Sequence, residues 1–278
     1  MGALKESGHY YHPNGKPAYT VAKANGKGRR KTTIADCRKL GLYPSVTTIL
    51  SLLNKPALNS WREKLIVEHT DDTEREPGEA AERYIGRIFA KHKRITQSAA
   101  DRGSRIHGLL ESMTKGKPFL GIRSAGDELI ERAVSDYLRE LSGDDDWIAE
   151  ESAVCHRPKY AGKVDLYHPG LGIVLDYKSK EFGSESADRV KGWPDQGMQL
   201  GAYAQGLGIR EPRLINLFVS SSTPGLIVPY EHKDPERLVT GFNALAYYWW
   251  AMRGLDDPEE INAALRELDS EDEGPAED

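Results

Sequence analysis

Two short runs in the second half of the chain combine acidic residues with a lysine at strand-like spacing. They are residues 162–165, Gly-Lys-Val-Asp, and residues 175–178, Leu-Asp-Tyr-Lys, with a Pro-Gly-Leu-Gly turn at residues 169–172 between them. A hairpin through this turn predicts a register that pairs His168 with Ile173, Leu166 with Leu175, and Asp165 with Asp176.

The predicted register places two carboxylates opposite each other. Like charges in directly opposed strand positions are destabilising, and a divalent cation between them would offset the repulsion. Lys178 follows Asp176 by two residues, so its ammonium shares the same face. The opposite face is predicted to be apolar, with Val164, Leu166, Ile173, Leu175 and Tyr177. The alternative is a solvated sheet face on which the lysine neutralises the aspartates. We favour a metal site because the aspartates are opposed.

Length and composition limit the class of protein. The 278 residues can bury a sizeable core, and we find neither an apolar run of membrane-spanning length nor a cleavable signal. We therefore expect a soluble, cytoplasmic protein of a bacterial host cell, encoded by the bacterium or by a phage. Cys37 and Cys155 are too few for a four-thiolate iron–sulfur cluster or structural zinc site, and they indicate no disulfide framework.

Charge is unevenly distributed along the chain. The net charge is −5, but residues 255–278 contribute −10, so residues 1–254 carry +5 and residues 1–44 alone carry +7. The body can therefore bind a polyanion although the whole chain is acidic. We expect three parts: a basic strand and helical region at 1–95, a larger region at 96–254, and an acidic, disordered tail at 255–278.

Hydrophobic periodicity and breakers predict the elements that must position these residues. Residues 8–35 are predicted to form short strands and turns, and Ser45 or Thr47 to cap a short helix within 45–53. Further helices are predicted at 56–69, 78–94, 97–115, 124–141, 194–207 and 235–253, and strands at 147–156, 160–168, 172–180 and in a hairpin over 213–231. This order is typical of a mixed sheet flanked by helices, an α/β (α+β) fold.

Four motifs occur in an order that resembles a known family. They are Arg-Gly-Ser-Arg-Ile-His at 102–107, the runs at 162–165 and 175–178, and Gln-Leu-Gly-Ala-Tyr at 199–203. Together they resemble the RecB-like branch of the PD-(D/E)xK nucleases. The segment 43–50, with Lys55-Pro56 and Trp61, further resembles mitochondrial genome maintenance exonuclease and phage exonuclease-like proteins. The resemblance implies a restriction-endonuclease-like nuclease core at 96–254, with a helical N-terminal region at 1–95 that guides DNA.

The resemblance also implies a metal centre. The ligands would be His107, Asp165, Asp176 and the carbonyl of Tyr177, a mainly hard set that suits Mg²⁺ or Mn²⁺. Lys178 would act with them as a catalytic residue that positions water and stabilises developing charge. Some relatives carry an iron–sulfur cluster on four cysteines, and the two cysteines of this chain exclude it.

Further site residues follow from the same resemblance. Gln199 and Tyr203 lie one helical turn apart and would contact the substrate or brace the catalytic strands. Glu151, with Glu150 as its competitor, would support the lysine or a second metal. Candidates for phosphate contacts are Arg102, Lys163, Ser45 and Thr47, with helix capping as the alternative for the last two. The aromatic run 247–250 either stacks on bases or packs in the core, and we favour packing for most of it.

The sequence therefore predicts a divalent-metal-dependent DNA exonuclease that hydrolyses single strands or free ends in replication, recombination or repair. A structure-specific or restriction-type endonuclease, a vestigial nucleic-acid-binding protein and a small-molecule phosphohydrolase remain alternatives. We find no P-loop in the chain. Unwinding of duplex DNA would therefore need a partner such as a helicase, a polymerase or a single-strand-binding protein.

Overall fold

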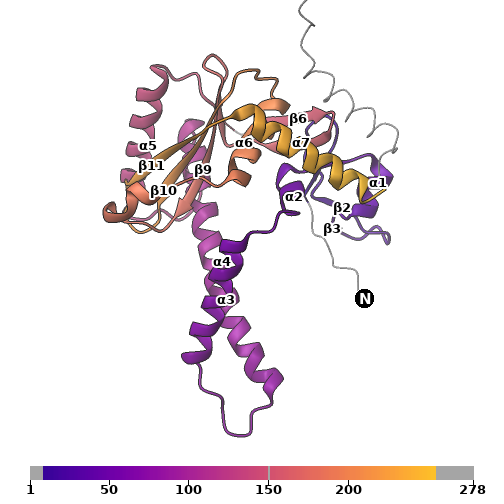
Figure 1. Ribbon diagram of the computed structural model, residues 1–278, viewed down its shortest axis with the longest axis vertical. Coiled ribbons are helices and arrows are strands. Elements are labelled where there is room, and N and C mark those ends of the chain that lie inside the picture. The colour runs from indigo at the N-terminus through magenta and orange to yellow at the C-terminus, as the bar shows by residue number, and fades with distance from the viewer. Residues whose placement is uncertain (1–8, 150, 255–278) are drawn as a thin grey trace, which may run out of the picture.

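The computed structural model describes residues 9–149 and 151–254, so Glu150 and the acidic tail lie outside the described residues. Figure 1 shows the arrangement of the elements. The helices are α1 (Ile34–Leu40), α2 (Val46–Leu50), α3 (Pro56–Asp71), α4 (Ala81–Thr114), α5 (Asp127–Ser142), the 3₁₀ helix η1 (Ser184–Arg189), α6 (Pro194–Gly206) and α7 (Pro235–Ala251). The strands are β1 (Tyr10–Tyr11), β2 (Thr20–Ala22), β3 (Arg29–Lys31), β4 (Tyr43–Pro44), β5 (Ile148–Ala149), β6 (Ser152–His156), β7 (Lys159–Lys163), β8 (Leu166–His168), β9 (Ile173–Lys180), β10 (Arg213–Ser220) and β11 (Ile227–His232).

The centre of the molecule is a mixed five-stranded sheet in the order β11-β10-β9-β8-β5. β9 and β10 are parallel, and the other neighbouring pairs are antiparallel. Figure 1 shows α5 on one side of this sheet and α6 on the other. The protein is therefore a mixed α/β structure with a central mixed sheet and flanking helices, as the order of elements predicted.

Side chains that alternate along β9 and β10 pack into two separate hydrophobic cores, one on each face of the sheet. Alternate residues starting at Ile173 and Ile215 pack with α4 and α5, whereas Val174 and Leu214 pack with α6 and α7. Since successive side chains of a strand point to opposite faces, Asp176 falls on the α6 side of the sheet. The apolar period of these strands thus places a carboxylate beneath a helix.

The predicted hairpin is correct in its turn and in part of its register. β8 and β9 pair Leu166 with Leu175, Tyr167 with Val174 and His168 with Ile173. The ladder ends there, however, and Asp165 precedes β8, so the prediction that Asp165 opposes Asp176 in the ladder is wrong.

The reason for this error is that residues 159–168 do not form one strand. β7 pairs with β6 in a separate two-stranded sheet, and the chain changes sheets at residues 164 and 165. Val164 consequently packs in the α6 and α7 core, whereas Leu166 packs in the α4 and α5 core.

The N-terminal segment shares a core with the later part of the chain. Tyr10, Val46 and Ile49 belong to the same buried cluster as Leu200 and Trp249. The side chain of Ser45 caps α2 by accepting a hydrogen bond from the N–H of Thr48 at 3.0 Å, as predicted.

The prediction of two helices over 78–94 and 97–115 is wrong, because α4 is continuous from Ala81 to Thr114. Its interior contains no proline, and the hydroxyl of Thr96 bonds back to the carbonyl of His92 at 3.2 Å, so the β-branched pair at 95 and 96 does not interrupt it. The predicted boundary between residues 95 and 96 falls within this helix.

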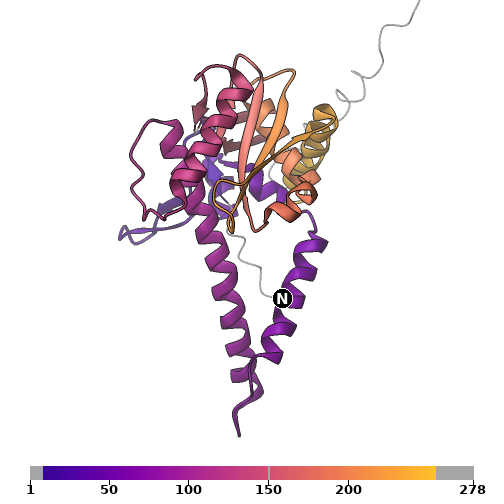
Figure 2. The ribbon, with the colours of Figure 1, turned by 90° about the vertical axis from the view of Figure 1, so that its left-hand side faces the viewer.

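The N-terminal half of α4 and α3 form an arm that projects from the body (Figure 1). Figure 2 shows that the two helices meet near the tip and separate toward the body. Among the helices that the structure describes, none combines the length and the apolar character needed to cross a bilayer.

Candidate metal centre

Asp176 lies at the centre of the site, in β9, and is almost fully buried. Three groups donate hydrogen bonds to its carboxylate: Lys178 Nζ to Oδ2 at 2.6 Å, Asn216 Nδ2 to Oδ2 at 3.0 Å, and Gln199 Nε2 to Oδ1 at 3.2 Å. Burial raises the pKa of Asp176, and the ammonium of Lys178 opposes that shift. The carboxylate is therefore held in place by groups from β9, β10 and α6.

Gln199 connects three of the predicted residues. Its Oε1 accepts a hydrogen bond from Lys178 Nζ at 3.2 Å, and its Nε2 lies 3.1 Å from the hydroxyl of Tyr203. Tyr203 in turn packs on Gly162, where a Cβ atom would lie 2.5 Å from the tyrosine ring. The close approach explains why the run at 162–165 begins with glycine, and it joins that run to the motif on α6.

Asp165 replaces a missing strand partner at the edge of β9. Beyond Leu175, no strand among the described residues pairs with β9 on the β8 side. There the N–H of Tyr177 donates to Asp165 Oδ2 at 3.1 Å. Because β8 begins only at Leu166, the edge of β9 is open where Asp165 and Asp176 come near each other.

His107 reaches the same carboxylate from α4, with its Nδ1 atom 3.1 Å from Asp165 Oδ2. Burial lowers the pKa of His107, but its hydrogen bond to Asp165 and the charges of Asp165 and Asp176 outweigh this effect and raise it. A carboxylate only accepts hydrogen bonds, so Nδ1 carries the proton, and in the neutral ring Nε2 has a free lone pair. That lone pair could bind a cation.

The donor set fits a hard divalent cation. It offers one imidazole nitrogen and two carboxylates, and the charge of Asp165 adds to burial in raising the pKa of Asp176. A divalent cation would relieve this repulsion. In the part of the chain that the structure describes, no three histidine, cysteine, aspartate or glutamate side chains already lie in ion-holding positions. Instead, the ammonium of Lys178 contacts Oδ2 of Asp176. The carbonyl of Tyr177 as a ligand stays a prediction.

Glu151 lies between β5 and β6 and is exposed. Its carbonyl accepts a hydrogen bond from the N–H of Val164 at 2.9 Å, which helps to fix the segment that carries Asp165. Its charge adds to desolvation in raising the pKa of Tyr167. The structure therefore places Glu151 near Tyr167, and its support of Lys178 stays a prediction.

Three of the predicted phosphate contacts lie on surfaces near the site. Thr47 lines a cavity of about 430 Å³ that also includes Gln199 in its wall. The ammonium of Lys163 is 3.6 Å from a carboxylate oxygen of Glu111, one helical turn after His107. Arg102 is exposed and contacts Ser98 at 3.1 Å. Ser45, the fourth candidate, is buried as the cap of α2.

Two residues of the site were not predicted from the sequence. Asn216 contacts Asp176, and His232 Nε2 lies 2.7 Å from Asn216 Oδ1. A signal was present for Asn216, because it is the one polar residue in the apolar run 214–219. His232 had no such signal, since it ends a strand with mixed polarity.

The aromatic run on α7 is mainly structural, as we favoured. Trp249 and Trp250 are buried, and the indole N–H of Trp250 donates to the carbonyl of Lys159 at 2.8 Å. Tyr248 is exposed.

The site thus combines a fixed, buried carboxylate with a second carboxylate, an imidazole and an ammonium at the edge of the sheet. Such groups can hold a divalent cation and stabilise negative charge that develops on a substrate. No protein-family model and no curated protein matches this chain.

Proposed function

We propose that the protein is a divalent-metal-dependent deoxyribonuclease of the RecB-like PD-(D/E)xK type, and that it acts as an exonuclease on single strands or free ends. The observation that carries the proposal is the connected cluster of His107, Asp165, Asp176 and Lys178, in which adjacent members lie in contact or interact electrostatically. All four belong to motifs from which the sequence predicted this chemistry.

The residues of the cluster have distinct tasks. His107, Asp165 and Asp176 would hold Mg²⁺ or Mn²⁺. The bound ion would polarise the scissile phosphate and lower the pKa of a water molecule. Lys178 stabilises negative charge on the phosphate, and Gln199 keeps the ammonium beside Asp176 through its own hydrogen bonds to both.

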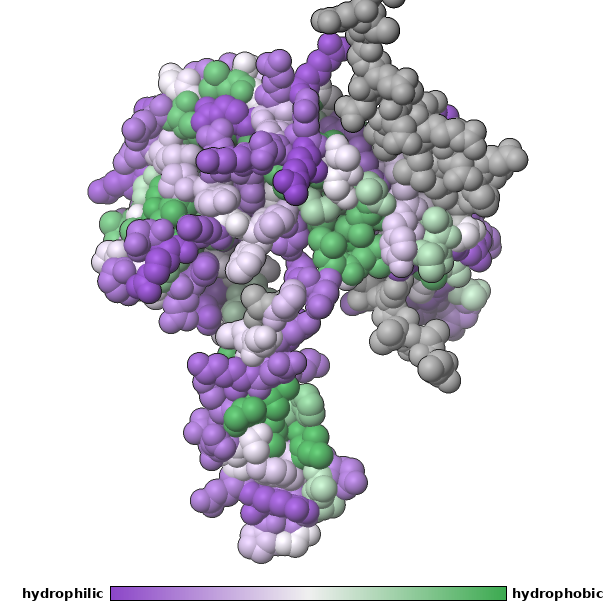
Figure 3. Space-filling model, in the orientation of Figure 1, coloured by the Kyte–Doolittle hydropathy of each residue, from purple (hydrophilic) through white to green (hydrophobic). Residues whose placement is uncertain are grey.

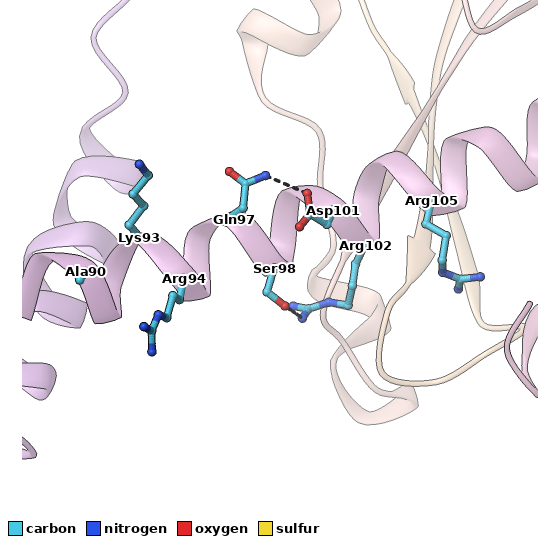
Figure 4. Close-up of a pocket in the computed structure, with 8 residues that line it drawn as sticks. All are labelled: Ala90, Lys93, Arg94, Gln97, Ser98, Asp101, Arg102 and Arg105. Carbon is cyan, nitrogen blue, oxygen red and sulfur yellow. Dashed lines mark hydrogen bonds between the residues drawn. The ribbon is translucent and has the colours of Figure 1, made fainter. Parts of the chain in front are cut away.

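Exposed arginines on α4, the helix that also carries His107, support a polyanionic substrate. Figure 4 shows two rows of side chains on this helix. One row contains Arg94, Ser98 and Arg102, and the other contains Gln97 and Asp101, which bond to each other at 2.8 Å. The arginine row is exposed and can contact phosphates of a nucleic-acid backbone.

The same helix carries both this row and His107, but at about 3.6 residues per turn Arg94 and Arg102 each lie about 140° around the helix from His107, so they point to different sides of α4. From Arg94 to His107 the axial distance is about 20 Å at the ordinary rise of an α-helix. Arg105 lies between them, but the buried carboxylate of Asp127 neutralises it at 2.7 Å. We therefore assign phosphate contacts to Arg94 and Arg102, and a structural role to Arg105.

Exposed aromatic residues on the arm favour a single strand over a duplex. Trp61 of α3 and Phe89 of α4 are 44% and 53% exposed. Figure 3 shows apolar surface on the arm between hydrophilic stretches. Exposed rings beside cationic side chains are suited to stacking on unpaired bases, whereas the bases of a duplex are covered by their neighbours.

The test is a nuclease assay on end-labelled linear and on circular single-stranded DNA with Mn²⁺, Mg²⁺ or EDTA. Wild type is compared with Lys178→Ala and with Lys233→Ala, a control at an exposed lysine between β11 and α7. We expect metal-dependent loss of the linear substrate alone, abolished by Lys178→Ala and unchanged in the control. Cutting of circles would indicate an endonuclease. DNA binding without any cutting would indicate a vestigial site.

A further inference from the structure

Asn216 of β10 lies directly beside Asp176 of β9. The parallel pairing of β9 and β10 aligns the two residues, and the side chain of Asn216 is fully buried. Its Nδ2 atom donates to Asp176 Oδ2 at 3.0 Å. It therefore contacts Asp176 from within the sheet, whereas Lys178 is partly exposed.

The hydrogen bonds around Asn216 have a determined direction. The carboxylate of Asp176 can only accept, so the amide nitrogen of Asn216 faces it and Oδ1 faces His232. His232 Nε2, at 2.7 Å from that oxygen, must then be the donor. A neutral ring protonated at Nε2 meets this need, and burial lowers the pKa of His232 to about 4.

The position of the His232 ring is in turn determined by packing. A Cβ atom at Gly197 would lie 2.7 Å from the ring, and one at Gly192 would also lie 2.7 Å from it. The ring of Tyr230 packs edge-on at a centroid distance of 4.9 Å. Gly192, just before α6, and Gly197, in its first turns, therefore leave room for the imidazole.

We propose that Asn216 and His232 are positioning residues that orient the carboxylate of Asp176 for metal binding and thereby set the affinity of the centre for Mg²⁺ or Mn²⁺. This inference rests on the proposed function. An approaching dication repels the ammonium of Lys178, but it does not repel a neutral amide. Asn216 can therefore keep its hydrogen bond to Asp176 when the cation arrives, and His232 prevents the amide from turning over.

A purely structural role makes a different prediction. A satisfied buried network that only stabilises the fold would lower stability when broken, with no change in metal affinity. The test must therefore measure cation binding directly. We use calorimetric titration of the DNA-free protein with Mn²⁺, alongside the melting temperature of each variant.

The variants are matched in chemistry. Asn216→Leu removes both hydrogen bonds with little change in size, and Asn243→Leu makes the same change at a buried amide on α7. His232→Phe removes the donor to Asn216, whereas His232→Gln retains an N–H that can replace it. Removing an outer partner of a metal ligand typically costs about 10-fold to 100-fold in affinity.

We expect Mn²⁺ affinity to fall by about that factor in Asn216→Leu, to fall less in His232→Phe, and to recover in His232→Gln. Asn243→Leu should melt earlier but bind Mn²⁺ as wild type does. If Asn216→Leu fails to fold, the two His232 variants decide the question. Folded Asn216→Leu and His232→Phe proteins with unchanged affinity would overturn the positioning role and leave the proposed function standing. A wild type that binds no Mn²⁺ would overturn both.

Discussion

The sheet around Asp176 and the α3–α4 arm differ in how their polar and aromatic side chains are held. In the sheet, both oxygens of a buried carboxylate have hydrogen-bond donors, and each donor comes from a packed strand or helix. On the arm, arginines and aromatic rings are exposed on helices that project from the body. Under the proposed function, groups that must be precisely placed sit in the core, whereas groups that would contact a long, variable substrate lie on an extension.

One helix takes part in both regions. The C-terminal half of α4 buries Leu109 and carries His107, and there Arg105 pairs with the buried Asp127. The N-terminal half exposes Phe89 and Arg94. A single continuous helix therefore connects the two regions.

Asp165→Asn should separate the two regions most clearly. It removes a charge at a side chain that is partly exposed, so the protein should fold while hydrolysis falls at least about 100-fold. Binding of single-stranded DNA in EDTA should be unchanged. The measurement is a single-turnover cleavage rate beside an anisotropy titration. Asp188→Asn, at a side chain 82% exposed on η1, is the control. Equal losses of cleavage and binding would show that the regions are not separate.

Shortening a side chain to alanine should affect stability very differently in the two halves of α4. Leu109→Ala empties a fully buried site and should lower the free energy of unfolding by about 2–5 kcal/mol. Phe89→Ala should cost less than about 1 kcal/mol, because the ring is half exposed. Urea denaturation at neutral pH measures both. Similar losses would mean that the arm is packed against something in solution.

Neutralising the arginine row should weaken binding without affecting hydrolysis of bound strands. In Arg94→Ala with Arg102→Ala, the dependence of log affinity on log salt should flatten by about 1.4, the expected effect of two phosphate contacts on a single strand. Affinity near physiological salt should fall by about tenfold. Titrations at several salt concentrations test this. Arg139→Ala, an exposed arginine on α5, serves as the control. An unchanged salt slope would exclude this row from the substrate path.

The smallest expected effect concerns acid stability. Burial lowers the pKa of His232 from 6.5 to about 4, and the charge of Asp195 opposes the shift. Between these two pH values the unfolded chain binds a proton that the folded protein does not, so stability falls as the pH is lowered through this window. In His232→Gln the free energy of unfolding should fall less steeply with decreasing pH, because up to one fewer proton is taken up on unfolding. Urea denaturation at pH 7, 5.5 and 4.5 measures the slopes. Identical slopes would show that the ring is not shielded.

Much of the local structure was predictable from the sequence. The Pro-Gly turn at 169–172 and its three-pair register, the hairpin of β10 and β11, and the helices that begin at Pro56, Pro194 and Pro235 follow from turn residues, alternation and proline at the first helical turn. These signals are local, because each depends on the conformation of a few neighbouring residues.

Six members of the site were predictable from the sequence, but Asn216, His232 and the geometry of the site were not. The sequence indicated His107, Asp165, Asp176, Lys178, Gln199 and Tyr203, and the structure brings all six together. The sequence did not indicate that Asp165 would accept a hydrogen bond from the edge of β9.

The sequence by itself determined which residues carry charge, where turns occur and which faces of β9 and β10 are apolar. Only the tertiary structure decided that β7 joins β6, that β8 starts at Leu166, that α4 continues through Thr96, and that Asn216 and His232 support Asp176. The physical reason is that a backbone period is set within a few residues, whereas the choice of a strand partner or of a buried hydrogen bond depends on packing between distant segments, such as Tyr203 against Gly162.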